Sequence, residues 1–173
     1  MQDDDNVIDR WMTHRRASWF AFASFGVLIA NILLTVATGS IAVFEFAGPA
    51  YRVLLIPVIF CLPAPAWARF GGWFWVMFDS SLNIGSINGM SEELAFQLRM
   101  GVHLAFGIWA VSVAICASGL LRIAGLLVGI VTPGYSFIAP WAPAAILPVT
   151  ALLLMAYILT CGLHLRRFDR QAA

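Results

Sequence analysis

Residues 18–44 read SWFAFASFGVLIANILLTVATGSIAVF, a run without a charged side chain. A helix rises about 1.5 Å per residue, so this run is long enough to cross a hydrocarbon core of roughly 30 Å. It predicts a first membrane span. Further apolar runs over about 51–67, 95–121 and 141–165 predict three more.

The composition agrees with an integral membrane protein. Of the 173 residues, 61% are hydrophobic and 11% are charged, and the mean hydropathy is +0.87. A soluble domain of this size needs more polar residues than this sequence contains in order to cover its surface. We therefore predict an all-α protein with a four-helix transmembrane domain over 18–165. A cytoplasmic N-terminal segment (1–17) and a basic cytoplasmic tail (166–173) flank it.

Arginine placement predicts the orientation. All ten basic residues are arginine, which favours a bacterial protein. With four spans, both chain ends share a side with the loop between spans two and three. That side holds Arg10, Arg15, Arg16, Arg69, Arg99, Arg166, Arg167 and Arg170, and the other side holds Arg52 and Arg122. Because positive residues stay in the cytoplasm, we expect both termini to be cytoplasmic in a bacterial inner membrane.

Segment 67–78 is dense in aromatic residues and follows Pro63 and Pro65, which interrupt a helix. If span two ran through this segment, Arg69 would lie about 15 Å from Asp79, well inside hydrocarbon. We therefore expect a short interfacial helix here, between spans two and three. Turns are expected at 47–49 and 132–134, and the short apolar stretch 123–131 is expected to lie along the outer interface or to extend the third helix out of the bilayer.

Several polar and small residues inside or beside the spans are candidates for packing and lipid contacts. Ala23, Gly26 and Ala30 form a small-residue stripe on which another helix could pack. Glu45 is expected to pair with Arg52 or Arg122, and no acid is expected at mid-membrane. The tail arginines predict contacts with anionic lipid headgroups: Arg166, Arg167 and Arg170.

His103 and His164 are the candidate cofactor ligands. Spans three and four are expected to be antiparallel neighbours, which could bring the two imidazoles together near the inner face. Such a pair is what a b-type haem with two histidine ligands requires. Histidine near the end of a span also suits the interface without any ligand, so both interpretations stay open.

No catalytic or nucleotide-binding motif is present: there is no P-loop, GxGxxG, HExxH or nucleophile elbow. The sequence therefore favours a non-catalytic accessory or partner-binding subunit of a membrane complex, or a homo-oligomer, without nucleic-acid binding. One alternative is a haem- or quinone-binding anchor that uses His103 and His164. Another is a small transporter or channel built on the proline-broken second span.

Overall fold

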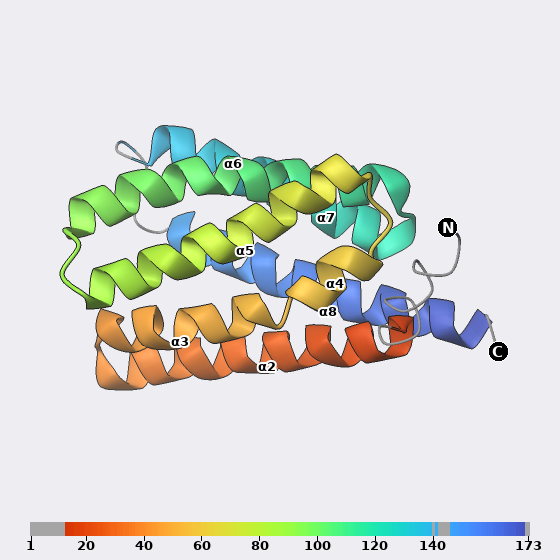
Figure 1. Ribbon diagram of the computed structural model, residues 1–173, viewed down its shortest axis with the longest axis horizontal. Coiled ribbons are helices and arrows are strands. Elements are labelled where there is room, and N and C mark those ends of the chain that lie inside the picture. Colours follow the sequence, from red (N-terminus) through yellow and green to blue (C-terminus); the bar gives the residue numbers. More distant parts are fainter. Residues whose placement is uncertain (1–12, 140, 142–145, 172–173) are drawn as a thin grey trace, which may run out of the picture.

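The computed structural model describes residues 13–139, 141 and 146–171, and within these residues it contains helices and no strands. The helices are α2 (His14–Thr38), α3 (Ile41–Val53), α4 (Ile56–Cys61), α5 (Ala66–Ile87), α6 (Glu92–Cys116), α7 (Gly119–Ile138) and α8 (Ile146–Gln171). The long helices lie side by side and alternate in direction (Figure 1). As a result, α2 begins and α8 ends at the same end of the bundle, on the right in Figure 1.

Helix boundaries follow local capping chemistry. The Thr13 hydroxyl accepts a hydrogen bond from the Arg16 amide at the start of α2. The Ser91 hydroxyl accepts one from the Leu94 amide at the start of α6. Gly39 ends α2 with a φ of 63°, a left-handed conformation that glycine adopts without strain.

Five segments are long and apolar enough to cross a membrane: His14–Thr38, Ala42–Cys61, Glu92–Cys116, Gly119–Ile138 and Pro148–Phe168. The second of them combines α3 and α4, between which the helix is interrupted before Pro57. These segments support a helical membrane protein. The prediction of four spans is not confirmed, because the chain between the predicted third and fourth spans forms a separate helix, α7.

The stretch 123–131 lies within α7 and not in a loop along the interface. Helix α6 ends at Cys116, and the chain turns before α7 at Gly119, where φ is 64°. Helix α7 then packs closely along α6. The two helices are so near one another that a side chain at position 125 or 129 would clash with α6, and both positions are glycine. A Cβ at Gly129 would lie 2.8 Å from Val111 Cγ2. Small residues at this contact let the two helix backbones approach.

Both predicted proline turns are wrong. Pro49 lies inside α3 and Pro133 inside α7. The chain reverses instead at 39–40, between α2 and α3, and after Ile138. Gly107 on α6 accommodates the Pro133 ring, so the proline is part of a packed helix contact.

Segment 67–78 belongs to α5, a helix of 22 residues that packs against α3 and α6 (Figure 1). It is not a short, separate interfacial helix. Gly72 lies directly against the indole of Trp109 on α6, and Trp75 is buried. The other aromatic residues of α5 face outward. This correction matters for function, because α5 carries Asp79 into the bundle.

Candidate functional site

Four charged side chains meet inside the bundle, contributed by α3, α5 and α6. The Arg99 guanidinium of α6 donates to both carboxylate oxygens of Glu45 on α3, with each N–O distance 3.0 Å. Its Nε donates to Asp79 Oδ1 of α5, also at 3.0 Å. The other Asp79 oxygen pairs with Arg52 Nη2 of α3 at 2.7 Å. We call Glu45, Arg52, Asp79 and Arg99 the ion cluster.

Asn83 connects the ion cluster to the backbone. Its side-chain oxygen accepts a hydrogen bond from Arg99 Nη2 at 2.9 Å, and its Nδ2 donates to the Glu45 carbonyl at 3.0 Å. Asn83 lies one helical turn after Asp79, so both side chains emerge from one face of α5. The Asn83 amide packs against Gly48 of α3, which has no side chain. A Cβ at position 48 would overlap Asn83 Nδ2 and lie 2.9 Å from Arg52 Nη1.

The ion cluster is removed from solvent. The side chains of Arg52 and Asp79 are 4% and 2% exposed, and those of Arg99 and Glu45 are 19% and 14% exposed. Arg52 lies about 16 Å along the axis from the start of its helix at Ile41, deep inside the bundle. Charges at such depth are costly unless they are paired and hydrogen-bonded, as they are here.

A cavity of about 450 Å³ lies against the ion cluster. All of the long helices contribute to its wall, and the residues that line it are Ile32, Val36, Phe44, Tyr51, Arg52, Trp75, Asp79, Arg99, His103, Phe106, Thr132, Pro148, Thr150, Ala151 and Leu154. Val36 is 76% exposed, so the cavity reaches the surface beside α2. The wall is mainly apolar, and its charged groups come from the ion cluster.

Unpaired polar atoms lie in this wall. Arg52 is 3% exposed, yet its Nε and Nη1 have no hydrogen-bond acceptor within the described residues. The hydroxyl of Thr132 on α7 is also buried without a partner there. These three atoms have almost no exposed surface, so they face protein and not the cavity. The Arg52 guanidinium also lies over the Tyr51 ring, with Cζ 4.8 Å from the ring centroid.

His103 is in the same cavity and is held by α7. Its Nδ1 lies 2.9 Å from Ser136 Oγ, and the Ser136 hydroxyl donates to the Thr132 carbonyl. Behind the cavity, Trp75 and Phe106 pack with ring centroids 4.6 Å apart, and Tyr157 of α8 meets Trp109 at 5.5 Å. This aromatic packing joins α5, α6 and α8 beneath the cavity.

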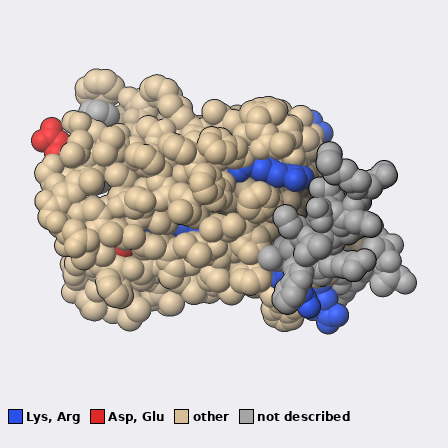
Figure 2. Space-filling view, in the orientation of Figure 1, with Lys and Arg blue, Asp and Glu red and all other residues tan. Residues whose placement is uncertain are grey.

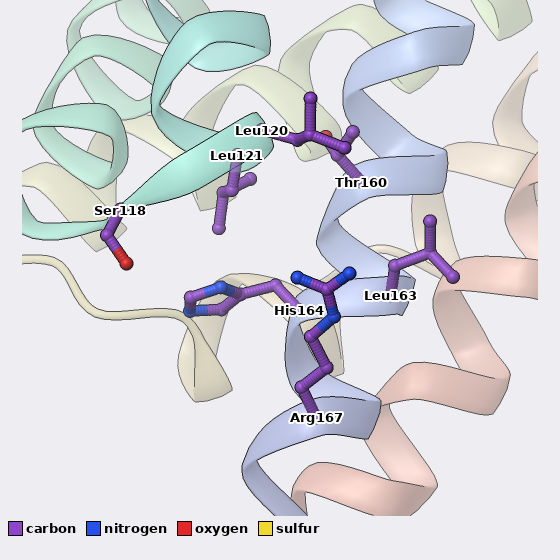
Figure 3. A pocket seen from close by; sticks show the side chains of 7 residues that line it. All are labelled: Ser118, Leu120, Leu121, Thr160, Leu163, His164 and Arg167. Atoms are coloured by element: carbon purple, nitrogen blue, oxygen red, sulfur yellow. The ribbon is translucent and has the colours of Figure 1, made fainter.

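His164 lies elsewhere, in a separate pocket of about 30 Å³. It points from α8 toward Ser118 and Leu121, with Arg167 beside it (Figure 3). The structure therefore does not bring His103 and His164 together. Two imidazoles that line separate pockets do not hold one haem iron between them. Nor does any group of three metal-ligating side chains occur in the part of the chain that the structure describes.

The other predicted residues lie on the outside of the bundle. Ala23, Gly26 and Ala30 are exposed on α2, and a Cβ at Gly26 would contact nothing within 4 Å. Arg166 lies over the Trp19 ring at 5.9 Å, and Arg167 is exposed beside His164. The side chain of Arg170 lies outside what the structure describes.

The proline-broken region does not reach the cavity. No residue of the stretch 57–65 lines the cavity. Val58, Ile59 and Leu62 are instead buried in the apolar core. A channel along these prolines thus has no polar path in the described residues.

Sequence reasoning missed the ion cluster because Glu45 and Arg52 were assigned to the outer side of the membrane, and Arg99 and Asp79 to the inner side. Glu45 was expected to pair with Arg52 or Arg122, and it pairs with Arg99. Arg99 was expected at the inner face. The available signal was the i, i+4 spacing of Asp79 and Asn83, which puts both side chains on one face of a helix.

Comparison of the chain with protein-family models, curated proteins and solved structures returns no match. What the site does must be argued from its own residues.

Proposed function

We propose that this protein crosses a bacterial inner membrane six times, with α5 as a crossing helix and both chain ends in the cytoplasm. The 22 residues of α5 span about 33 Å, enough for the hydrocarbon core. Trp67, Phe70 and Phe74 give α5 an outward apolar face that suits lipid. Its lower hydropathy comes from inward residues such as Asp79 and Asn83, whose charge and polarity are satisfied inside the bundle.

The arginine distribution supports this orientation. Outside the ion cluster, the arginines of the described helices lie near the helix ends on the side where α2 begins and α8 ends: Arg15, Arg16, Arg69, Arg122, Arg166, Arg167 and Arg170. Basic side chains gather at this end in Figure 2, and acidic ones are visible at the other. Glu92 and Glu93 begin α6 at that opposite end. In the six-crossing arrangement Arg122 joins the cytoplasmic side, so the positive-inside bias is stronger than with four spans.

We propose further that the protein is a membrane-embedded binding protein for a small molecule held in the central cavity. Its volume of about 450 Å³ lies within the usual range of small-molecule sites, about 300–1,000 Å³. An apolar wall with a few converging polar groups is also typical of such sites.

The observation that carries this proposal is Arg52. A guanidinium that is 3% exposed, lines a cavity and leaves two nitrogens without acceptors is costly in an apolar medium. Those two nitrogens face protein, so a ligand would meet the part of the guanidinium that lines the cavity. The pairing with Asp79 fixes the position of this side chain before any ligand arrives, which lowers the ordering cost of binding.

The test compares what co-purifies with three forms of the protein extracted into lipid nanodiscs. Ala151→Trp fills the cavity from α8, and Ala156→Trp places the same indole on the exposed face of that helix. We expect native mass spectrometry to detect a bound small molecule on the wild type and on Ala156→Trp, and to find it lost from Ala151→Trp. Equal occupancy of all three forms, or a cavity that holds water alone, overturns the proposal.

A second candidate function is that of an accessory subunit, favoured by the unoccupied stripe of Ala23, Gly26 and Ala30. These residues face away from the other helices of this chain, so a further helix could approach α2 closely there. Gly26→Leu should then shift the native mass in mild detergent from an oligomer or complex to the monomer. A monomeric wild type without a co-purifying partner removes this candidate.

A further inference from the structure

A chain of hydrogen bonds fixes the tautomer of the His103 imidazole. His103 Nδ1 lies 2.9 Å from Ser136 Oγ, and the Ser136 hydroxyl donates to the Thr132 carbonyl at 3.1 Å. A serine hydroxyl has a single hydrogen, and a carbonyl oxygen can only accept. With the imidazole hydrogen on Nδ1, both contacts are hydrogen bonds; with it on Nε2, the serine hydrogen serves only one of them. The complete chain therefore places the hydrogen on Nδ1.

The other ring nitrogen, His103 Nε2, then carries a lone pair that is open to the cavity. In a neutral imidazole with its hydrogen on Nδ1, Nε2 is an acceptor. Nε2 has no hydrogen-bond partner within the described residues and, unlike Arg52 Nε and the Thr132 hydroxyl, it is not fully enclosed by protein. Because His103 belongs to the cavity wall, the cavity presents an unfilled acceptor.

The carboxylates of the ion cluster are not available in the same way. Glu45 is not part of the cavity wall, and the Asp79 side chain is 2% exposed. Both Asp79 oxygens are held by guanidinium groups, one by Arg52 and one by Arg99. A cationic ligand therefore meets no exposed carboxylate that would replace its water, which makes its burial costly. A carboxylate ligand has no hydrogen to donate to His103 Nε2.

The rest of the wall is mainly apolar, so most of the ligand must be apolar too. Ile32 and Val36 of α2 and Ala151 and Leu154 of α8 belong to this part of the wall. Val36 is 76% exposed in the last turn of α2, so the cavity opens there on the outside of the bundle. A molecule dissolved in the membrane would enter at this opening.

Building on the proposed binding function, we infer that the central cavity takes an uncharged amphiphile with a hydroxyl head group, an alcohol or a phenol, and that His103 selects it. The hydroxyl donates to His103 Nε2, and the apolar body lies between α2 and α8. Ser136 is a positioning residue, because it holds the imidazole in the tautomer that accepts. Ketones, ethers and carboxylates lack the hydrogen that His103 requires.

The first test uses three probes with the same twelve-carbon chain and a photoreactive diazirine at its end. One carries a hydroxyl head group, one a methyl ether, which accepts hydrogen bonds but cannot donate, and one an ammonium group. Labelling of cavity-lining peptides is measured by mass spectrometry in nanodiscs at pH 8, above the ordinary histidine pKa of about 6.5, as a function of probe concentration in the membrane. We expect half-maximal labelling at an about three- to tenfold lower concentration for the alcohol than for either other probe, as one additional hydrogen bond predicts.

Variants at the two imidazoles of the membrane helices locate the effect. His103→Leu removes the acceptor and keeps a bulky side chain, so the alcohol should label no better than the ether. Unchanged labelling by the ether shows that the cavity of this variant is intact. His164→Leu is the matched control, because His164 lines the separate pocket, and it should change labelling by neither probe.

The second test observes the tautomer itself. In protein with isotope-labelled histidine nitrogens, the signals of His103 are those that disappear in His103→Leu. Solid-state NMR at pH 8 should show a protonated Nδ1 and an unprotonated Nε2 in the wild type. Ser136→Ala should mix the two tautomers and weaken labelling by the alcohol, with no change for the ether.

The outcomes separate the two proposals. A protonated Nε2 in the wild type, equal labelling by the alcohol and the ether, or a His103→Leu variant that still prefers the alcohol overturns the head-group inference alone. If no probe labels the cavity residues of the wild type, the proposed binding function fails as well.

Discussion

Arg99 of α6 binds Glu45 of α3 through both ends of its guanidinium, with two N–O distances of 3.0 Å across 54 positions of sequence. The same side chain reaches Asp79 of α5 with its Nε. One arginine therefore joins three helices at the depth of the cavity. The geometry of the ion cluster depends on the packing of all three helices against one another.

Removing one charge from the ion cluster should be much worse than removing a pair. Asp79→Ala leaves the Arg52 guanidinium buried without its acidic partner and should lower the free energy of unfolding by about 3–5 kcal/mol. The double variant Arg52→Met, Asp79→Leu removes both charges of that pair and should recover a large part of the loss. Unfolding in mixed micelles measures the free energy of unfolding of the single and of the double variant.

Glu92→Ala is the control for this experiment, since Glu92 is exposed at the start of α6. It should change the unfolding free energy by less than about 1 kcal/mol. Single and double variants that are destabilised equally would contradict the account of a balanced ion cluster.

Gly48→Ala should disturb the ion cluster through Asn83. The added methyl group would occupy the space of Asn83 Nδ2, so the hydrogen bond to the Glu45 carbonyl should break. We expect a loss of about 1–3 kcal/mol, as for overpacking in a core. In an Asn83→Ala background the same substitution should cost clearly less, because the obstructing amide is gone. Costs that are equal in both backgrounds would show that Asn83 is not the obstacle.

Helix α7 should depend on its glycines for packing against α6. In Gly129→Ala the new Cβ would lie 3.0 Å from the Val111 amide nitrogen, so the two backbones must separate. We expect a lower melting temperature in detergent and a loss of about 1–3 kcal/mol. Gly101→Ala on α6 is the matched control, since its Cβ would contact nothing within 4 Å. It should be neutral or slightly stabilising, because alanine favours a helix by up to about 1 kcal/mol. Similar losses in the two variants would argue against this close contact.

The placement of His103 and His164 predicts the absorption spectrum. Because the two imidazoles line separate pockets, protein produced with ample haem should show no Soret band of a haem with two histidine ligands. A stoichiometric band that disappears in His103→Ala and in His164→Ala would require a different arrangement of α6 and α8.

The helical class and the membrane location could be predicted from the sequence, since apolar length alone decides both. The path of the chain could not. Arg122 looked like the end of a span, although the turn is made three residues earlier by Gly119 in a left-handed conformation. Pro133 looked like a turn, although the space at Gly107 allows its ring to pack inside the bundle.

The ion cluster was hidden for a related reason. The energetic cost of Arg69 in hydrocarbon argued against a crossing segment 67–78, and Asp79 beside it was therefore not placed inside the bundle. A buried Asp79 would also be costly if it were considered alone. The cost falls once Arg52 and Arg99 supply the opposite charges, and those residues come from helices far away in the sequence. Pairing between distant helices cannot be seen from hydropathy.

The most direct test of the account is the side of the membrane reached by the two loops that flank α6. In a variant without Cys61, Cys116 and Cys161, single cysteines replace Asn88, before α6, and Ser118, after it. A membrane-impermeant thiol reagent added to intact cells should label the cysteine at 88 and should reach the one at 118 only after the membrane is opened. A reporter fused to the N-terminus establishes that this end is cytoplasmic. With that end inside, protection of position 88 together with outside labelling of position 118 would mean that α5 does not cross, and neither the ion cluster nor its cavity could form as described.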